Sequence, residues 1–131
     1  MTHPFRTAVE RRDRDAMVAA MAPDITFHSP VAFKPFVGRA AAAELFSNLL
    51  EVFKDFEYTD ELSGDGTVVL LFRARVGGKA VQGMDYMKLG AGGLVEEFTV
   101  MLRPLSAVLA LAEEMGPRVA HLPKGPAPTS T

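Results

Sequence analysis

Hydrophobic residues repeat at helical spacing in the first part of the chain and at strand spacing further on. Residues 4–21 are amphipathic, which predicts helix, and the charged cluster 11–15 marks either a polar face or a break between two shorter helices. Residues 24–30 alternate apolar and polar and end at a proline, which predicts a short strand. After Gly38, the apolar spacing over 39–53 predicts another helix.

The rest of the chain predicts a meander of strands followed by one helix. Strands separated by glycine-rich turns are expected over residues 56–62, 67–76, 79–89 and 94–102. A helix is expected from Pro104 to about Met115. Residues 1–116 then form a single domain, and residues 117–131 form a tail rich in Pro and Gly. This order of elements predicts the α+β class, with helices on one side of an antiparallel sheet.

The Gly77-Gly78 turn fixes how the two central strands pair. As a two-residue hairpin loop it places Leu70 opposite Asp85, so that both side chains share one face of the sheet. That face is apolar apart from one carboxylate, and it carries Leu70, Phe72, Ala74, Val81, Gly83, Asp85 and Met87. A slip of one residue would reverse every side chain, so the prediction depends on the turn length.

Asp85 is the candidate catalytic residue. Gly83 is expected to leave space beside it, and a four-residue second turn places Phe98 opposite Asp85 and Glu96 opposite Met87. A carboxylate on an apolar face is costly to ionise, so it must find donors, stay protonated or meet water in a cavity. Two interpretations follow: a pocket acid with a raised pKa, or a structural carboxylate satisfied by its neighbours.

Two polar residues next to Pro30 are further candidates. Ser29 shares the apolar face of its strand, so it either lines a pocket or makes a local turn contact. His28 points to the opposite face of a regular strand, and inward only if a bulge turns it. The candidate ligand-binding residues are therefore Ser29, His28, Phe72, Met87 and Phe98.

The other face of the predicted hairpin is too apolar for an exposed sheet. It carries Val69, Leu71, Met84 and Tyr86. A large apolar patch of this kind indicates a partner surface. Arg73 and Arg75 are expected to form ion pairs with Glu97 on the same face.

Composition and charge narrow the function classes. The net charge of −2 offers no basic footprint for nucleic acid or anionic lipid. The absence of cysteine excludes disulfides and thiolate chemistry, and the three histidines lack metal-ligand spacing. No apolar run is long enough to span a bilayer. We therefore expect a soluble, cytoplasmic protein that uses neither a metal nor a cofactor.

Two segments resemble a known superfamily. Residues 9–30, with the step Ala22-Pro23-Asp24 before a strand that ends in proline, resemble the opening of nuclear transport factor 2-like domains. Residues 84–95 resemble the segment Ile-Asp-x-Phe-x-Phe-x-x-x-Gly-x-Val of ketosteroid isomerases. The resemblance implies a SnoaL-like, cone-shaped fold with a curved sheet around an apolar pocket. It also implies that the outer sheet face pairs two subunits into a homodimer.

The catalytic residues of these families carry over only in part. Asp85 lies where ketosteroid isomerases place the protonated Asp of their oxyanion hole, whereas Ser29 stands for their general base and Phe5 for their tyrosine. Steroid isomerisation is therefore not expected. Limonene epoxide hydrolases need an Arg where this chain has Gly83, which argues against epoxide opening. SnoaL-like cyclases require an acid/base residue in an apolar pocket. The resemblance implies that Asp85, together with His28, meets this requirement.

Two functions fit the sequence. The first is a domain that binds a small hydrophobic molecule bearing a carbonyl or hydroxyl, with cofactor-free acid/base chemistry of the isomerase, cyclase or dehydratase type at Asp85. The second is a non-catalytic dimerisation or binding module of the same fold. The environment of Asp85 distinguishes them.

Overall fold

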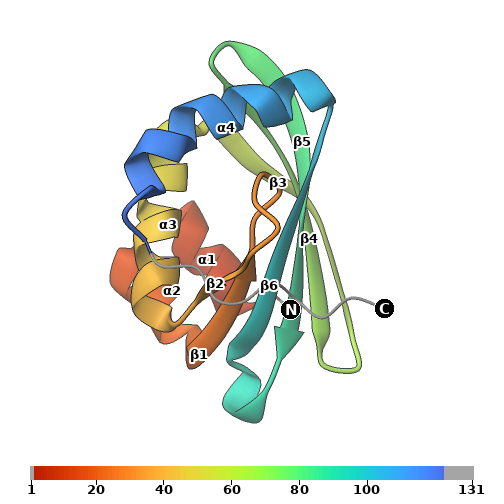
Figure 1. Ribbon diagram of the computed structural model, residues 1–131. Helices are drawn as coiled ribbons and strands as arrows, with labels where there is room; N and C mark the ends of the chain where they lie inside the picture. The colour runs from red at the N-terminus through yellow and green to blue at the C-terminus, as the bar shows by residue number, and fades with distance from the viewer. Residues whose placement is uncertain (1, 123–131) are drawn as a thin grey trace.

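Helices α1–α4 lie on one side of a curved six-stranded sheet in the computed structural model, which describes residues 2–122 (Figure 1). The helices are α1 Pro4–Glu10, α2 Arg14–Ala19, α3 Arg39–Val52 and α4 Leu105–Val119. The strands are β1 Met21–His28, β2 Phe36–Val37, β3 Lys54–Gly64, β4 Thr67–Val76, β5 Lys79–Leu89 and β6 Val95–Arg103. A short 3-10 helix, η1 Ala91–Gly93, joins the last two strands.

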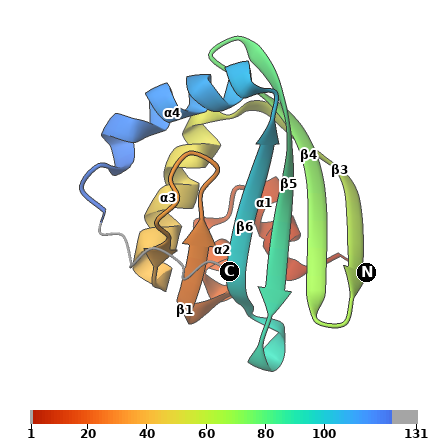
Figure 2. The same ribbon diagram turned by 45° about the vertical axis from the view of Figure 1, so that its right-hand side comes forward.

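The strands follow the order β2-β1-β6-β5-β4-β3 across the sheet, and Figure 2 shows β1 beside β6, followed by β5, β4 and β3. Strands β3 to β6 form the predicted antiparallel meander, whereas β1 pairs with β6 in parallel. The predicted α+β class is confirmed, and the sheet is mixed. The parallel pair joins segments far apart in the chain, which no local sequence signal specifies.

The N-terminal segment breaks into two helices rather than forming one. His3 caps α1 by accepting a hydrogen bond from the Phe5 N–H at its Nδ1, over 3.0 Å. Asp13 caps α2 in the same way by accepting from the Ala16 N–H over 3.1 Å. Between them Arg12 has a φ of 53°, which no helix can continue. The charged cluster 11–15 therefore marks a break.

Strand β1 begins earlier and ends earlier than the expected 24–30. Met21 is already paired with Val95 of β6, and the pairing is interrupted before it resumes at Thr26. Pro23 lies in this interruption, so its lack of a backbone N–H costs no hydrogen bond between the strands. Because β1 ends at His28, the residues that follow it, Ser29 and Pro30, belong to the loop before β2.

The β4–β5 hairpin has the predicted register. Gly77 and Gly78 both have positive φ, 54° and 79°, as a two-residue hairpin turn requires. Leu70 pairs with Asp85 and Phe72 with Gly83, and every residue predicted for the apolar face is buried. The tight turn therefore decided which face Asp85 occupies.

The predicted register of β6 was wrong by two residues. Phe98 pairs with Met87 rather than Asp85, and Val100 pairs with Asp85. A shift in the ladder follows Lys88, next to η1, and it changes the count on which the prediction depended. Glu96 accordingly does not oppose Met87 and is exposed.

Four phenylalanines form the centre of the core between the helices and the sheet. Phe5 of α1 and Phe46 of α3 meet Phe27 of β1 and Phe98 of β6, with ring centroids 4.9–5.5 Å apart. Most of these contacts are edge-to-face, the arrangement aromatic quadrupoles favour. This cluster holds α1 and α3 against the β1–β6 side of the sheet.

Helix α4 continues past the expected end near Met115 to Val119, so it includes the first residues assigned to the tail. Arg118 pairs with Glu51 at 2.6 Å, which joins the end of α4 to α3. Residues 123–131 of the expected tail lie outside the described residues. No helix within residues 2–122 has the length and hydrophobicity needed to cross a membrane.

Candidate functional site

A cavity of about 410 Å³ lies between the inner face of the sheet and the helices. Its size is within the usual range for small-molecule pockets. The side chains around it are almost all apolar, and they include Phe27, Phe36, Phe46, Phe53, Phe56, Phe72, Val100, Leu111 and Met115. Among the described lining residues, the polar side chains are Ser29, Tyr58 and Asp85.

Asp85 lies in the middle of β5, between Leu70 of β4 and Val100 of β6. It is 5% exposed and is the one ionisable carboxyl in the buried core of residues 2–122. The Asp85 carboxyl lines the cavity. In agreement, no side-chain oxygen within residues 2–122 is fully buried without a hydrogen-bond partner. The sequence prediction of a buried carboxylate on an apolar face is confirmed.

Burial raises the pKa of Asp85 to about 8, from an ordinary value of 3.8. The cause is desolvation, because the low-dielectric surroundings penalise the charged form. The Tyr58 side chain acts in the opposite direction and lowers this pKa. At neutral pH Asp85 is therefore mostly protonated and presents an O–H donor to the cavity.

Tyr58 is the polar partner of Asp85, and the sequence reasoning did not single it out. It lies on β3 opposite Phe72 and is buried. Burial, and then the charge of Asp85, raise the pKa of Tyr58 well above its ordinary value. Strands β3 and β4 are joined by a tight two-residue turn, Asp65-Gly66, with both φ values positive. Counting back from that turn would place Tyr58 opposite Arg73 on the outer face, and the register shift between Tyr58 and Asp60 moves it opposite Phe72 instead.

Ser29 and His28 lie on different sides of the sheet, as expected, although Ser29 belongs to the loop after β1 and not to the strand. Ser29 lines the cavity, and its hydroxyl also accepts a hydrogen bond from the Val31 N–H at 3.1 Å, so both interpretations of this residue hold together. His28 lies outside the lining, on the other face of the sheet, with its Nε2 3.9 Å from Glu97. No bulge turns His28 inward, because its pairing with Thr99 continues the ladder.

Of the three apolar residues predicted to contact a ligand, one lines the cavity. Phe72 does so, whereas Met87 and Phe98 are fully buried and are not part of the lining. The space expected beside Asp85 at Gly83 is also filled. A Cβ at Gly83 would lie 2.6 Å from Cε2 of Phe72 and 2.7 Å from Cδ2 of Leu102. Gly83 therefore admits the Phe72 ring rather than a ligand.

The outer sheet face has different ion pairs from those expected. Arg73 pairs with Glu57 at 2.6 Å, and Glu97 faces His28. The apolar row continues across three strands, since Leu71 pairs with Met84 and Met84 with Met101. Met101 is 52% exposed. Within residues 2–122, no cluster of His, Asp and Glu side chains could hold a metal ion.

Comparison with known proteins places this geometry in a family. The sequence profile of the SnoaL-like domain matches residues 3–98. The chain belongs to the SnoaL-like domain family. This confirms the superfamily resemblance and supports a ligand-binding or isomerase-type fold. A comparison with proteins of curated function found no match.

Solved structures extend the likeness over most of this SnoaL-like chain. A steroid delta-isomerase from Pseudomonas aeruginosa is 39% identical, with a TM-score of 0.83 over 88% of this chain and 86% of that one. A protein with a cystatin-like fold from Silicibacter pomeroyi is 30% identical, with a TM-score of 0.84 over 92% and 88%. A de novo designed protein with a curved β-sheet, 14% identical, has a TM-score of 0.65 over 86% and 98%. Fold likeness alone therefore does not imply an activity.

Proposed function

We propose that the cavity binds a small hydrophobic molecule bearing one carbonyl or hydroxyl oxygen, to which Asp85 and Tyr58 donate hydrogen bonds. The observation that carries this is a buried carboxyl, whose pKa is raised to about 8 by desolvation, beside a buried phenol in an apolar cavity. Tyr58 hydrogen-bonds to Asp85 in the free protein, so its single O–H reaches the ligand oxygen by exchanging that partner. Donors in a site with few competing polar groups orient an oxygen and stabilise charge that develops on it.

The chemistry that such a pair supports is acid catalysis at that oxygen, as in isomerisation, cyclisation or dehydration. Asp85 supplies the proton, and its pKa near 8 suits proton transfer near neutral pH. Ser29 is the remaining polar side chain among the described lining residues, and its hydroxyl is a weak base. Among the described lining residues, the Asp85 carboxylate left after protonation of the ligand is therefore the group that takes up the proton the product releases.

A matched pair of probes tests the proposed anchor. 2-Acetylnaphthalene and 2-ethylnaphthalene have nearly the same shape, and only the ketone accepts a hydrogen bond. At pH 6, Asp85→Leu is expected to lower the ratio of ketone to hydrocarbon affinity by roughly tenfold, and Tyr58→Phe by a smaller factor. Both affinities are measured by NMR titration. A ratio that stays the same in both variants rules out the anchor.

The outer sheet face supports a homodimer as a second element of the proposal. Its apolar row of Leu71, Met84 and Met101 continues through paired strands, with Val69 and Tyr86 beside it. Contiguous apolar surface on a sheet is costly to leave in water. A twofold pairing would cover the same face in both subunits.

Met84→Glu is expected to convert the dimer to a monomer, because it places a charge at the centre of the paired face. Sedimentation-velocity ultracentrifugation measures the change. The matched control is Leu109→Glu, at a 60% exposed residue of α4 away from the sheet, which is expected to remain dimeric. A monomeric wild type, or a Met84→Glu variant that remains dimeric, would show that this face is not the interface.

A further inference from the structure

Arg6 of α1 contacts the ring of Tyr58. The guanidinium carbon of Arg6 lies 5.5 Å from the centroid of the Tyr58 ring, within the range of a cation–π interaction. The Arg6 side chain is 23% exposed, so the charge is partly removed from water. Such contacts strengthen on desolvation. The polar partner of Asp85 therefore has a fixed cation over its ring.

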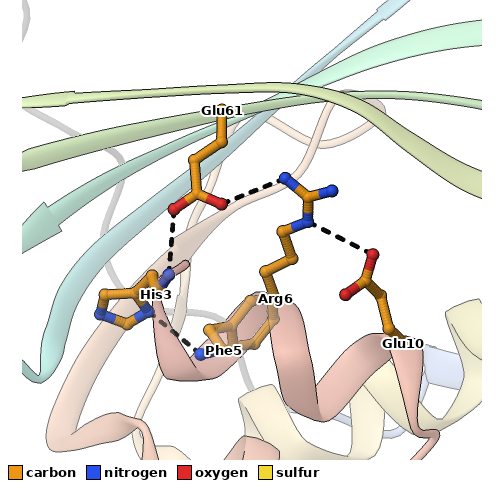
Figure 3. A network of polar contacts seen from close by, with 5 residues as sticks. All are labelled: His3, Phe5, Arg6, Glu10 and Glu61. Carbon is orange, nitrogen blue, oxygen red and sulfur yellow. Dashed lines mark hydrogen bonds and ion pairs between the residues drawn. The ribbon is translucent and has the colours of Figure 1, made fainter. Parts of the chain in front are cut away.

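Two carboxylates hold the Arg6 guanidinium in this place (Figure 3). Its Nη1 donates to Oε1 of Glu61 at 3.2 Å, and its Nε donates to Oε2 of Glu10 at 3.3 Å. The second oxygen of Glu61 accepts from the backbone N–H of His3 at 2.9 Å. Both oxygens of Glu61 are thus occupied, and its side chain is only 12% exposed. Arg6 is therefore fixed from both α1 and β3.

A bulge in β3 brings Glu61 and Tyr58 to the same face. Tyr58 pairs with Phe72, but the next pairs are Asp60 with Leu71 and Glu61 with Leu70, so Thr59 has no partner in the ladder. In a regular strand, residues 58 and 61 would point to opposite faces. The extra residue puts both on the inner face, under α1. Bulges often re-aim side chains next to functional sites.

We propose that Arg6 is a positioning residue that, held by Glu61 and Glu10, fixes the Tyr58 side chain against Asp85. The inference rests on the proposed function, because it assigns a purpose to Tyr58 at the same site. Arg6 does not line the cavity, so it acts through Tyr58 and does not touch the ligand.

The charges around Tyr58 agree with this role. Burial, then Asp85 and Glu10, raise the pKa of Tyr58, whereas Arg6 lowers it. Arg12 and Glu57 are the other charged groups nearby, and with Glu10 and Tyr58 they line a second pocket of about 180 Å³. Arg6 thus offsets part of the negative charge near Tyr58, which makes its O–H a stronger donor.

The test is a double-variant cycle of Arg6→Met and Tyr58→Phe, read by the carboxyl-carbon NMR titration of Asp85 and the ketone-to-hydrocarbon affinity ratio. Tyr58 lowers the pKa of Asp85, so each single variant is expected to raise it. Arg6→Met is expected to lower the affinity ratio by roughly threefold. In the Tyr58→Phe background it is expected to add nothing further to either readout.

Two variants and one control separate positioning from general stability. Arg6→Lys keeps the charge and is expected to recover part of the effect, and Glu61→Gln loosens Arg6 if Arg6→Met does not fold. Arg73→Met, which also breaks an Arg–Glu pair but on the outer face, is expected to change neither readout. An unchanged Asp85 titration in Arg6→Met and Glu61→Gln, or effects that add in the double variant, overturns the role of Arg6. A ratio unaffected by Asp85→Leu and Tyr58→Phe would instead remove the proposed function itself.

Discussion

Asp85→Asn is expected to remove a loss of stability that the wild-type protein shows between about pH 4 and pH 8. The carboxyl has a pKa of 3.8 in the unfolded chain and about 8 in the folded one. Between these values the unfolded chain has released a proton that the folded protein keeps, so stability falls by about 1.4 kcal/mol per pH unit. Below the lower value, and above the higher one, this contribution is constant with pH.

The free energy of unfolding of Asp85→Asn is expected to rise relative to that of the wild type as the pH increases. The introduced amide cannot ionise, so the variant gains on the wild type by several kcal/mol from pH 4 to pH 8. Urea unfolding across this range measures it. Asp60→Asn, at an exposed position of β3, is the matched control and is expected to show no such trend. A wild type that instead gains on Asp85→Asn as the pH rises would mean that the buried carboxylate is ionised and satisfied.

Gly83→Ala is expected to destabilise the protein by about 1–3 kcal/mol and to weaken the binding of both naphthalene probes. The added Cβ would lie 2.6 Å from Cε2 of Phe72 and 2.7 Å from Cδ2 of Leu102. Phe72 lines the cavity, so the ring can make room only by moving into it. Thermal unfolding and NMR titration of both probes measure the two effects.

The matched control is Gly64→Ala, in strand β3. A Cβ at Gly64 meets no atom within 4 Å, so this change is expected to be neutral or slightly stabilising. If Gly83→Ala is as stable as Gly64→Ala and binds the probes normally, the close packing of Phe72 over Gly83 does not shape the cavity.

The features predicted correctly from the sequence are those set by local chemistry. Two glycines at positive φ close the β4–β5 hairpin, and that single turn fixes Leu70 opposite Asp85. The alternation along β1 likewise places Phe27 at the cavity and His28 on the opposite face. The position of Asp85 in an apolar face could therefore be predicted with no knowledge of the tertiary fold.

The features that were missed depend on irregular pairing and on packing. The ladder shift after Lys88 moved β6 by two residues, and the bulge at Thr59 determines which way Tyr58 and Glu61 point. The space at Gly83 was filled by a ring from the neighbouring strand, because interiors pack to near-crystalline density. Neither a bulge nor a filled void leaves a periodic signal in the sequence.

The most direct test of the account is the pKa of the Asp85 carboxyl, measured by carbon NMR titration with Asp85→Asn to assign the signal. The account predicts a value near 8, and a further rise when 2-acetylnaphthalene binds, because the ketone accepts a hydrogen bond only from the protonated acid. A value near or below the ordinary 3.8, unchanged by the ketone, would contradict it and would make Asp85 a satisfied structural carboxylate.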